Sequence, residues 1–153
     1  MSNVMIKDSA DTISGIDTTS VKNSYAVIVY GGGLQAVAAA AKAARKLPDN
    51  KEVLLISPYP TNEIGGIATS GGQNYWDKKI WKNGIVNGGT FAYLFKKHEI
   101  YNTHHMSEEV LKEQLRKYAN VMVLPGYDIS KINTNSQKIQ NLVIRAIERD
   151  PND

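Results

Sequence analysis

The sequence has no cysteine, no long apolar run and no charge excess large enough to define a partner. The lack of cysteine excludes disulfides, thiolate nucleophiles and cysteine-ligated zinc sites. No apolar stretch approaches the roughly 20 residues that a membrane-spanning helix needs, so we expect no membrane partner. The formal net charge is +3 over 153 residues, and most lysines are interspersed with acids, so we expect no nucleic-acid partner.

Residues 1–24 lack the basic leader and the continuous apolar core that define a secretory signal. We therefore expect a cytoplasmic protein. The segment is rich in Ser, Thr, Asp and Asn, and this composition predicts a flexible N-terminal arm. A chain of this length accommodates one α/β core, so we expect a single domain after the arm, over residues 25–150.

Three segments after the arm predict a strand, a helix and a second strand. Residues 25–30 (YAVIVY) and 52–57 (EVLLIS) are β-branched or aliphatic runs, typical of strands buried on both faces. The alanine-rich residues 34–47 between them have high helix propensity and end before Pro48. Elements of these lengths predict a right-handed βαβ unit with parallel strands, and therefore an α/β fold.

The rest of the chain predicts two helices and three strands. Residues 58–95 contain many glycines and little periodicity, which predicts a long functional loop, with a helix beginning near Thr90. Residues 107–118 (SEEVLKEQLRKY) predict an amphipathic helix that begins with a Ser N-cap. Residues 120–126 predict a third strand, and the alternation over residues 127–148 around an NTNS turn predicts a C-terminal hairpin or meander.

Three consecutive glycines, Gly31, Gly32 and Gly33, stand between the first predicted strand and the helix. In the dinucleotide fingerprint G-x-G-x-x-G/A, the first glycine makes a tight turn and the second lets the backbone approach a pyrophosphate. Gly31, Gly33 and Ala36 match the three small positions, and a helix N-terminus favours anions. A tight turn without a ligand stays open as an alternative. An ATP P-loop does not match, because no Gly-Lys-Ser/Thr follows.

The second predicted strand ends in Ser57, where this fingerprint usually has an acid that accepts hydrogen bonds from the ribose hydroxyls. A serine makes one such bond in place of a charged bidentate one, a difference of about 1 to 3 kcal/mol. The missing negative charge also leaves NADP open as an alternative ligand. Glu63 is the nearest downstream acid, and it would substitute only if the loop folds back.

Residues 31–46 (GGGLQAVAAAAKAARK) and 53–77 (VLLISPYPTNEIGGIATSGGQNYWD) together resemble the N-terminal part of FAD-dependent oxidoreductases of the two-dinucleotide-binding-domain type. A bacterial group with a GG(M/I)ATSG segment after the second strand is the most similar. The resemblance covers about residues 25–148 and implies FAD as the cofactor. It also implies a glutathione-reductase-like fold, which is an incomplete Rossmann-like βαβ FAD-binding domain with a parallel sheet and a C-terminal hairpin or meander.

The same resemblance assigns binding residues, although it assigns no catalytic one. The glycine turn would hold the pyrophosphate, and the end of the second strand would lie along the adenosine ribose. The GGIATS segment would pass close to the pyrophosphate, ribityl chain and flavin, and a backbone group after the third strand would contact adenine. In that order the residues are Gly31, Gly32, Gly33, Leu34, Gln35 and Ala36; Ser57 and Pro58; Gly65, Gly66, Ile67, Ala68, Thr69 and Ser70; and Ile129.

Enzymes of this type complete the FAD site with a second glycine motif and a Gly-Asp pair far downstream, whereas this sequence ends at Asp153. Three expectations stay open. The chain is a fragment or one chain of a flavin-dependent oxidoreductase of a small organic molecule, completed by a second chain or a missing C-terminal part. Alternatively, it is a non-catalytic, self-associating binding or structural protein, or it binds FAD or another nucleotide weakly without catalysis.

Two further groups of residues have side chains of the types found in metal or cofactor sites. His98, His104 and His105 stand close in sequence, but adjacent histidines rarely point at one ion, so we expect no metal site. The aromatic residues of segment 73–84 (QNYWDKKIWKNG) follow the GGIATS segment. We expect these aromatic side chains to pack against a missing part of the protein or a partner chain, in preference to covering a bound flavin. Exposed aromatic rings would form an association surface, which predicts an oligomer.

Overall fold

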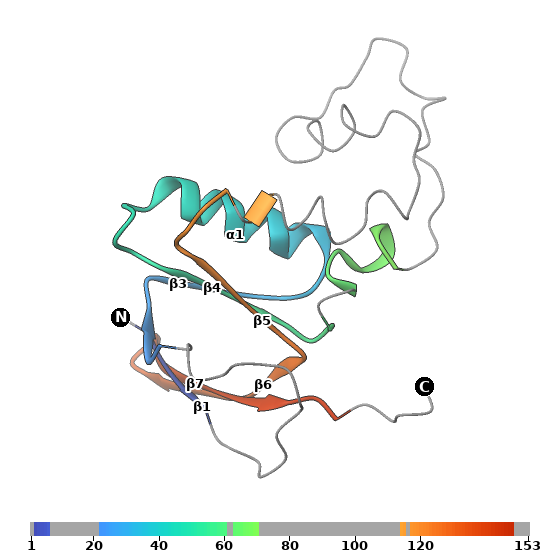
Figure 1. Ribbon diagram of the computed structural model, residues 1–153. Coiled ribbons are helices and arrows are strands. Elements are labelled where there is room, and N and C mark those ends of the chain that lie inside the picture. Colours follow the sequence, from blue (N-terminus) through green and yellow to red (C-terminus); the bar gives the residue numbers. More distant parts are fainter. Residues whose placement is uncertain (1, 7–21, 61–62, 71–113, 116, 149–153) are drawn as a thin grey trace, which may run out of the picture.

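The computed structural model describes residues 2–6, 22–60, 63–70, 114–115 and 117–148. Its strands and helices are β1 (Ser2–Ile6), β2 (Ser24–Tyr25), β3 (Val27–Tyr30), α1 (Leu34–Lys46), β4 (Val53–Ser57), the short 3-10 helix η3 (Gly66–Ala68), β5 (Val121–Pro125), β6 (Tyr127–Asn135) and β7 (Lys138–Ala146). They form three layers: α1, a parallel sheet of order β3-β4-β5, and a second sheet of order β2-β1-β7-β6 (Figure 1).

The central strand β4 is buried along its whole length. Val53 lies opposite Val27 of β3 on one side and Val121 of β5 on the other, with all three strands parallel. Side chains of a strand alternate between faces, so Leu55 packs in the cluster under α1 while Leu54 packs in the cluster toward the second sheet. The predicted βαβ unit is confirmed, and β4 is buried on both faces as expected. The same expectation is wrong for the first strand, because in the described part of the chain β3 is the terminal strand of this sheet and is only partly buried, with Tyr30 exposed.

Helix α1 packs closely on the parallel sheet because its inner face is made of small residues. Val37, Ala40, Ala41 and Ala44 recur at helical spacing, and all four are buried. The helix ends at Leu47, whose N–H donates to the carbonyl of Ala43 at 3.0 Å. The predicted helix over 34–47 is therefore confirmed to within one residue, and its small side chains hold it close to β3 and β4.

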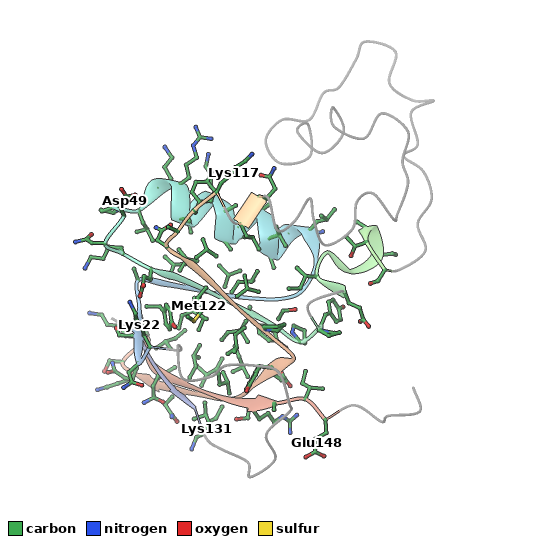
Figure 2. The ribbon with its side chains drawn as sticks, viewed as in Figure 1. Lys22, Asp49, Lys117, Met122, Lys131 and Glu148 are labelled. Atoms are coloured by element: carbon green, nitrogen blue, oxygen red, sulfur yellow. The ribbon has the colours of Figure 1, made fainter. Side chains whose placement is uncertain are left out.

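The second sheet covers the opposite face of the parallel sheet. Tyr127 of β6 and Ile144 of β7 are buried in the cluster that contains Leu54, and Figure 2 shows side chains, Met122 among them, filling the space between the two sheets. The hairpin turn lies at Ser136 and Gln137, which both have positive φ. The predicted C-terminal hairpin is confirmed, with its turn slightly later than the centre of the NTNS segment. The predicted α/β, Rossmann-like fold is confirmed as well.

Strand β1 is an element that the sequence did not predict. Residues Ser2–Ile6 pair antiparallel with β2 and parallel with β7. Their hydrogen-bond partners include a strand at the other end of the chain, so local composition carries no signal for them. Residues 7–21 of the predicted arm, the helix expected near Thr90 and most of the helix expected at 107–118 lie outside the described residues. Within the described ranges, no helix has the length and apolar content to cross a bilayer.

Candidate functional site

The glycine turn joins the carboxyl end of β3 to the first turn of α1. Gly31 donates its N–H to the carbonyl of Ile56 at 2.9 Å and has φ +139°, a conformation that side chains disfavour. A Cβ placed on Gly31 would lie 3.2 Å from the Cβ of Ala36. Small residues at both positions therefore let the helix begin directly above the strand end.

The N-terminus of α1 carries no side-chain cap and no acidic residue in its first turn. The carbonyl of Gly33 accepts from Ala36 at 3.1 Å and from Val37 at 3.2 Å, which closes the first turn. Of the atoms in the described residues, a Cβ on Gly33 would meet only Oε1 of Gln35, at 3.1 Å. The positive end of the helix dipole therefore meets no carboxylate of its own first turn, and this arrangement favours a bound anion.

The second glycine segment lies directly against the first. The N–H of Gly65 donates to the carbonyl of Gly32 at 2.6 Å, and Gly33 and Gly65 form an isolated parallel bridge. Gly66 has φ +60°, and a Cβ there would lie 3.6 Å from the Cα of Gly33. The structure thus brings together the two glycine segments on which the sequence resemblance depends.

The polar side chains of the GGIATS segment are used within the segment itself. Thr69 donates from Oγ1 to the carbonyl of Ile64 at 3.0 Å, and both it and Ser70 contact the carbonyl of Gly66. Ala68 is buried, whereas Ile67 is 70% exposed. The hydroxyls therefore fix the backbone of η3, and Ile67 is the apolar side chain that this turn presents to solvent.

Ser57, at the expected ribose position, is fully buried and bonded to its own chain. Its Oγ accepts from the N–H of Tyr59 and donates to the carbonyl of the same residue, both at 3.1 Å. The Tyr59 ring lies against Gly32, because a Cβ on Gly32 would clash with that ring and stand 2.8 Å from Oγ of Ser57. The sequence reasoning missed Tyr59. The sequence offers only an aromatic residue two positions after the strand end, and its contact with the glycine turn depends on the tertiary structure.

A second polar group lies beside the glycine turn, between the two sheets. The hydroxyl of Tyr30 donates to Oδ1 of Asp128 at 2.6 Å, and Asp128 also accepts from the N–H of Ile129 at 2.8 Å. The guanidinium of Arg145 lies 3.5 Å from the other carboxylate oxygen. The hydrogen bond to the carboxylate raises the pKa of Tyr30, and the same bond is the main cause that lowers the pKa of Asp128.

The remaining predicted residues differ in how near they lie to the turn. Ile129, the expected adenine contact, is in β6 and packs partly buried against the cluster between the sheets. Pro58 is half-buried between Ser57 and Tyr59. The histidines and the aromatic segment 73–84 lie outside the described residues, and among those described no set of three metal-ligating side chains is grouped.

The model of the family described as FAD dependent oxidoreductase matches residues 26–150, a range that contains the glycine turn, the GGIATS segment and the C-terminal hairpin. No curated protein matches the chain.

Proposed function

Because the chain belongs to the FAD-dependent oxidoreductase family, we propose that it is the FAD-binding part of an enzyme that oxidises or reduces a small organic molecule. The cofactor that this family implies is FAD, as expected from the sequence. The observation that carries the proposal is the meeting of two glycine segments, through the Gly65 to Gly32 hydrogen bond, at the uncapped N-terminus of α1.

The residues of the turn fit a diphosphate. Backbone N–H groups at a helix N-terminus attract phosphate oxygens, and glycines let a ligand approach the main chain. Among the described residues, only the end of the Gln35 side chain lies near the missing Cβ of Gly33, so Gly33 is the position where such an approach meets least resistance. In the proposal, residues 32–36 hold the pyrophosphate through the backbone, and residues 65–70 lie toward the flavin.

FAD supplies the redox chemistry when it is bound, and the protein supplies binding, orientation and electrostatics. The chain's own contribution is a preformed backbone surface. Gly31 and Gly66 hold positive φ values, and the hydroxyls of Thr69 and Ser70 are bonded to backbone carbonyls of the GGIATS segment and the residue before it. The described residues provide no acid or base aimed at the turn from α1, whose first turn lacks acids.

Completion by a second chain or a further part belongs to the same proposal. In the described part of the chain, β3 hydrogen-bonds to β4 alone, so its other side is an edge of the parallel sheet. An edge strand presents N–H and C=O groups that a further strand can pair with. This edge supports assembly with another strand, from a second chain or elsewhere in the protein.

Calorimetry with FAD tests the function, using Gly33→Val. Gly33 has φ −83°, which valine adopts, so the fold is retained while two methyl groups obstruct the approach to the turn. We expect the wild-type chain to bind FAD and Gly33→Val to lose at least about tenfold in affinity, about 1.4 kcal/mol. Ala39→Val, at an exposed position of α1, is the matched control and should bind as wild type does.

Two outcomes contradict the proposal. A purified wild-type chain that is colourless and gives no heat with FAD would exclude autonomous FAD binding. Equal affinity of Gly33→Val and wild type would show that the glycines serve the turn and not a ligand.

A further inference from the structure

The aromatic ring of Tyr59 lies near both glycine segments. A Cβ on Gly32 would clash with this ring, and a Cβ on Gly66 would lie 3.5 Å from it. Gly32 is buried, whereas Tyr59 is 40% exposed. The ring therefore covers the backbone of Gly32 on one side and faces solvent on the other.

The backbone of Tyr59 is held in place by three hydrogen bonds. Ser57 bonds to both its N–H and its carbonyl, and the N–H of Gly126 donates to the same carbonyl at 3.1 Å. The main chain cannot carry the ring away without breaking these bonds. Rotation about the χ1 torsion of Tyr59 can move the ring away from Gly32. Torsions of this kind interconvert between staggered wells, and the outer face of the ring is open.

We propose that Tyr59 is a gate on the nucleotide site, which competes with the ADP portion of the ligand for the backbone of Gly32. The inference rests on the proposed FAD-binding function. The gate adds that the affinity for FAD is limited by the fraction of protein molecules in which the Tyr59 ring has turned away from the glycines. Ser57 is the positioning residue, because its hydroxyl fixes the backbone from which the ring reaches Gly32.

The size of the effect follows from the populations of the two ring positions. When the competent state is a fraction f of the population, the apparent Kd is the intrinsic Kd divided by f. A ring that covers Gly32 in about nine chains of ten therefore weakens binding about tenfold. The ring would clash with a Cβ on Gly32, a residue that the proposal assigns to the pyrophosphate, so FAD and ADP should respond by the same factor and riboflavin should not respond.

The test compares the full-length wild-type chain with Tyr59→Ala and Tyr59→Phe by calorimetry. We expect Tyr59→Ala to bind FAD and ADP about tenfold more tightly, and Tyr59→Phe, which keeps the ring, to bind as wild type does. Circular dichroism checks that each variant is folded. Should Tyr59→Ala fail to fold, Tyr59→Leu removes the flat ring with less loss of volume and should bind more tightly in the same way.

The outcomes separate the gate from the function. Wild-type binding with equal or weaker binding by Tyr59→Ala overturns the gate and leaves the FAD site standing. Absence of FAD binding by every variant overturns both. Tighter binding by Tyr59→Ala that also extends to riboflavin overturns competition with the ADP portion, because the ring would then act elsewhere.

Discussion

The hydroxyl of Tyr30 donates a 2.6 Å hydrogen bond to Oδ1 of Asp128, and this bond joins the two sheets directly beside the glycine turn. Tyr30 is the last residue of β3, and Asp128 is the second residue of β6. Asp128 is also bonded to the N–H of Ile129 and faces Arg145. The strand end that leads into Gly31 is therefore fixed by a carboxylate from the other sheet.

Removal of the carboxylate should lower the pKa of Tyr30. The hydrogen bond to Asp128 is the largest cause that raises this pKa above 10.0, so Asp128→Ala should return it toward that value. NMR titration with ¹³C-labelled tyrosine measures the change, with Tyr30→Phe to assign the signal. An unchanged pKa in Asp128→Ala would show that the bond is not formed in solution.

The same bond gives a stability difference with a defined pH range. The pKa of Tyr30 is raised, so its contribution is complete below 10.0 and is lost as pH rises through the folded-state pKa. The pKa of Asp128 is lowered, so its contribution is complete above 3.8 and is lost as pH falls through its folded-state value. Urea unfolding of wild type and Tyr30→Phe should therefore differ by a constant amount at neutral pH, about 1 kcal/mol or less because Tyr30 is half exposed. A difference that persists at both pH extremes would contradict this origin.

Gly32→Ala should destabilise the fold through Tyr59. The added Cβ would clash with the Tyr59 ring and crowd Oγ of Ser57, and overpacking of this kind costs about 1 to 3 kcal/mol. In a Tyr59→Ala background the cost should fall, a coupling that urea unfolding of the four proteins measures. Gly33→Ala is the control and should cost less, since its Cβ meets only the end of Gln35. If the effects of Gly32→Ala and Tyr59→Ala were additive, the Tyr59 ring would not lie against Gly32.

Ser57→Ala should destabilise the chain by about 1 to 2 kcal/mol in the free energy of unfolding. The fully buried hydroxyl is the acceptor for the N–H of Tyr59, and its loss leaves that N–H without the bond. Ser70→Ala is the comparison, because the Ser70 hydroxyl is exposed and its contact with Gly66 is 3.4 Å long; this change should stay within about 0.5 kcal/mol. Equal effects of the two serines would contradict a special role for Ser57.

The centre of the parallel sheet should tolerate truncation least. Leu54 and Leu55 have no exposed surface and pack on opposite faces of β4, so replacement of either by Ala should cost about 2 to 5 kcal/mol. Ile132→Ala is the control, because Ile132 is 52% exposed on the hairpin and should lose less than about 1 kcal/mol. Thermal or urea unfolding measures all three variants. A small loss of stability in Leu54→Ala would mean that the second sheet does not cover the face of β4 on which Leu54 lies.

Sequence predicted the elements whose signal is local. The continuous apolar run of β4 specifies a buried strand, and the alanines of α1 specify a helix. The glycines before α1 specify the turn. Strand β1 carries no such signal, since it is defined by pairing with β7 at the far end of the chain. Long-range pairing of a short strand depends on where its partner lies, which composition does not report.

The candidate site was predictable in its backbone and not in its side chains. Gly31 and Gly33 were identifiable because they stand directly between a predicted strand and a predicted helix, which is the context that the dinucleotide fingerprint requires. The packing of Tyr59 on Gly32 depends on the loop conformation set by Ser57, and the meeting of Tyr30 with Asp128 depends on how the two sheets stack. Both contacts join residues whose proximity is decided by tertiary structure.

The parallel sheet is completed by β5, which follows β4 only after a long intervening segment. Strands β3 and β4 with α1 are close in sequence and can pair early, whereas alignment of Val53 with Val121 must wait for closure of that segment. The bond from Gly65 to Gly32 depends only on the early part. In kinetic terms, the nucleotide turn should be shaped before the sheet beneath it is complete, so amides of β3 and β4 should gain hydrogen-exchange protection before those of β5 during refolding.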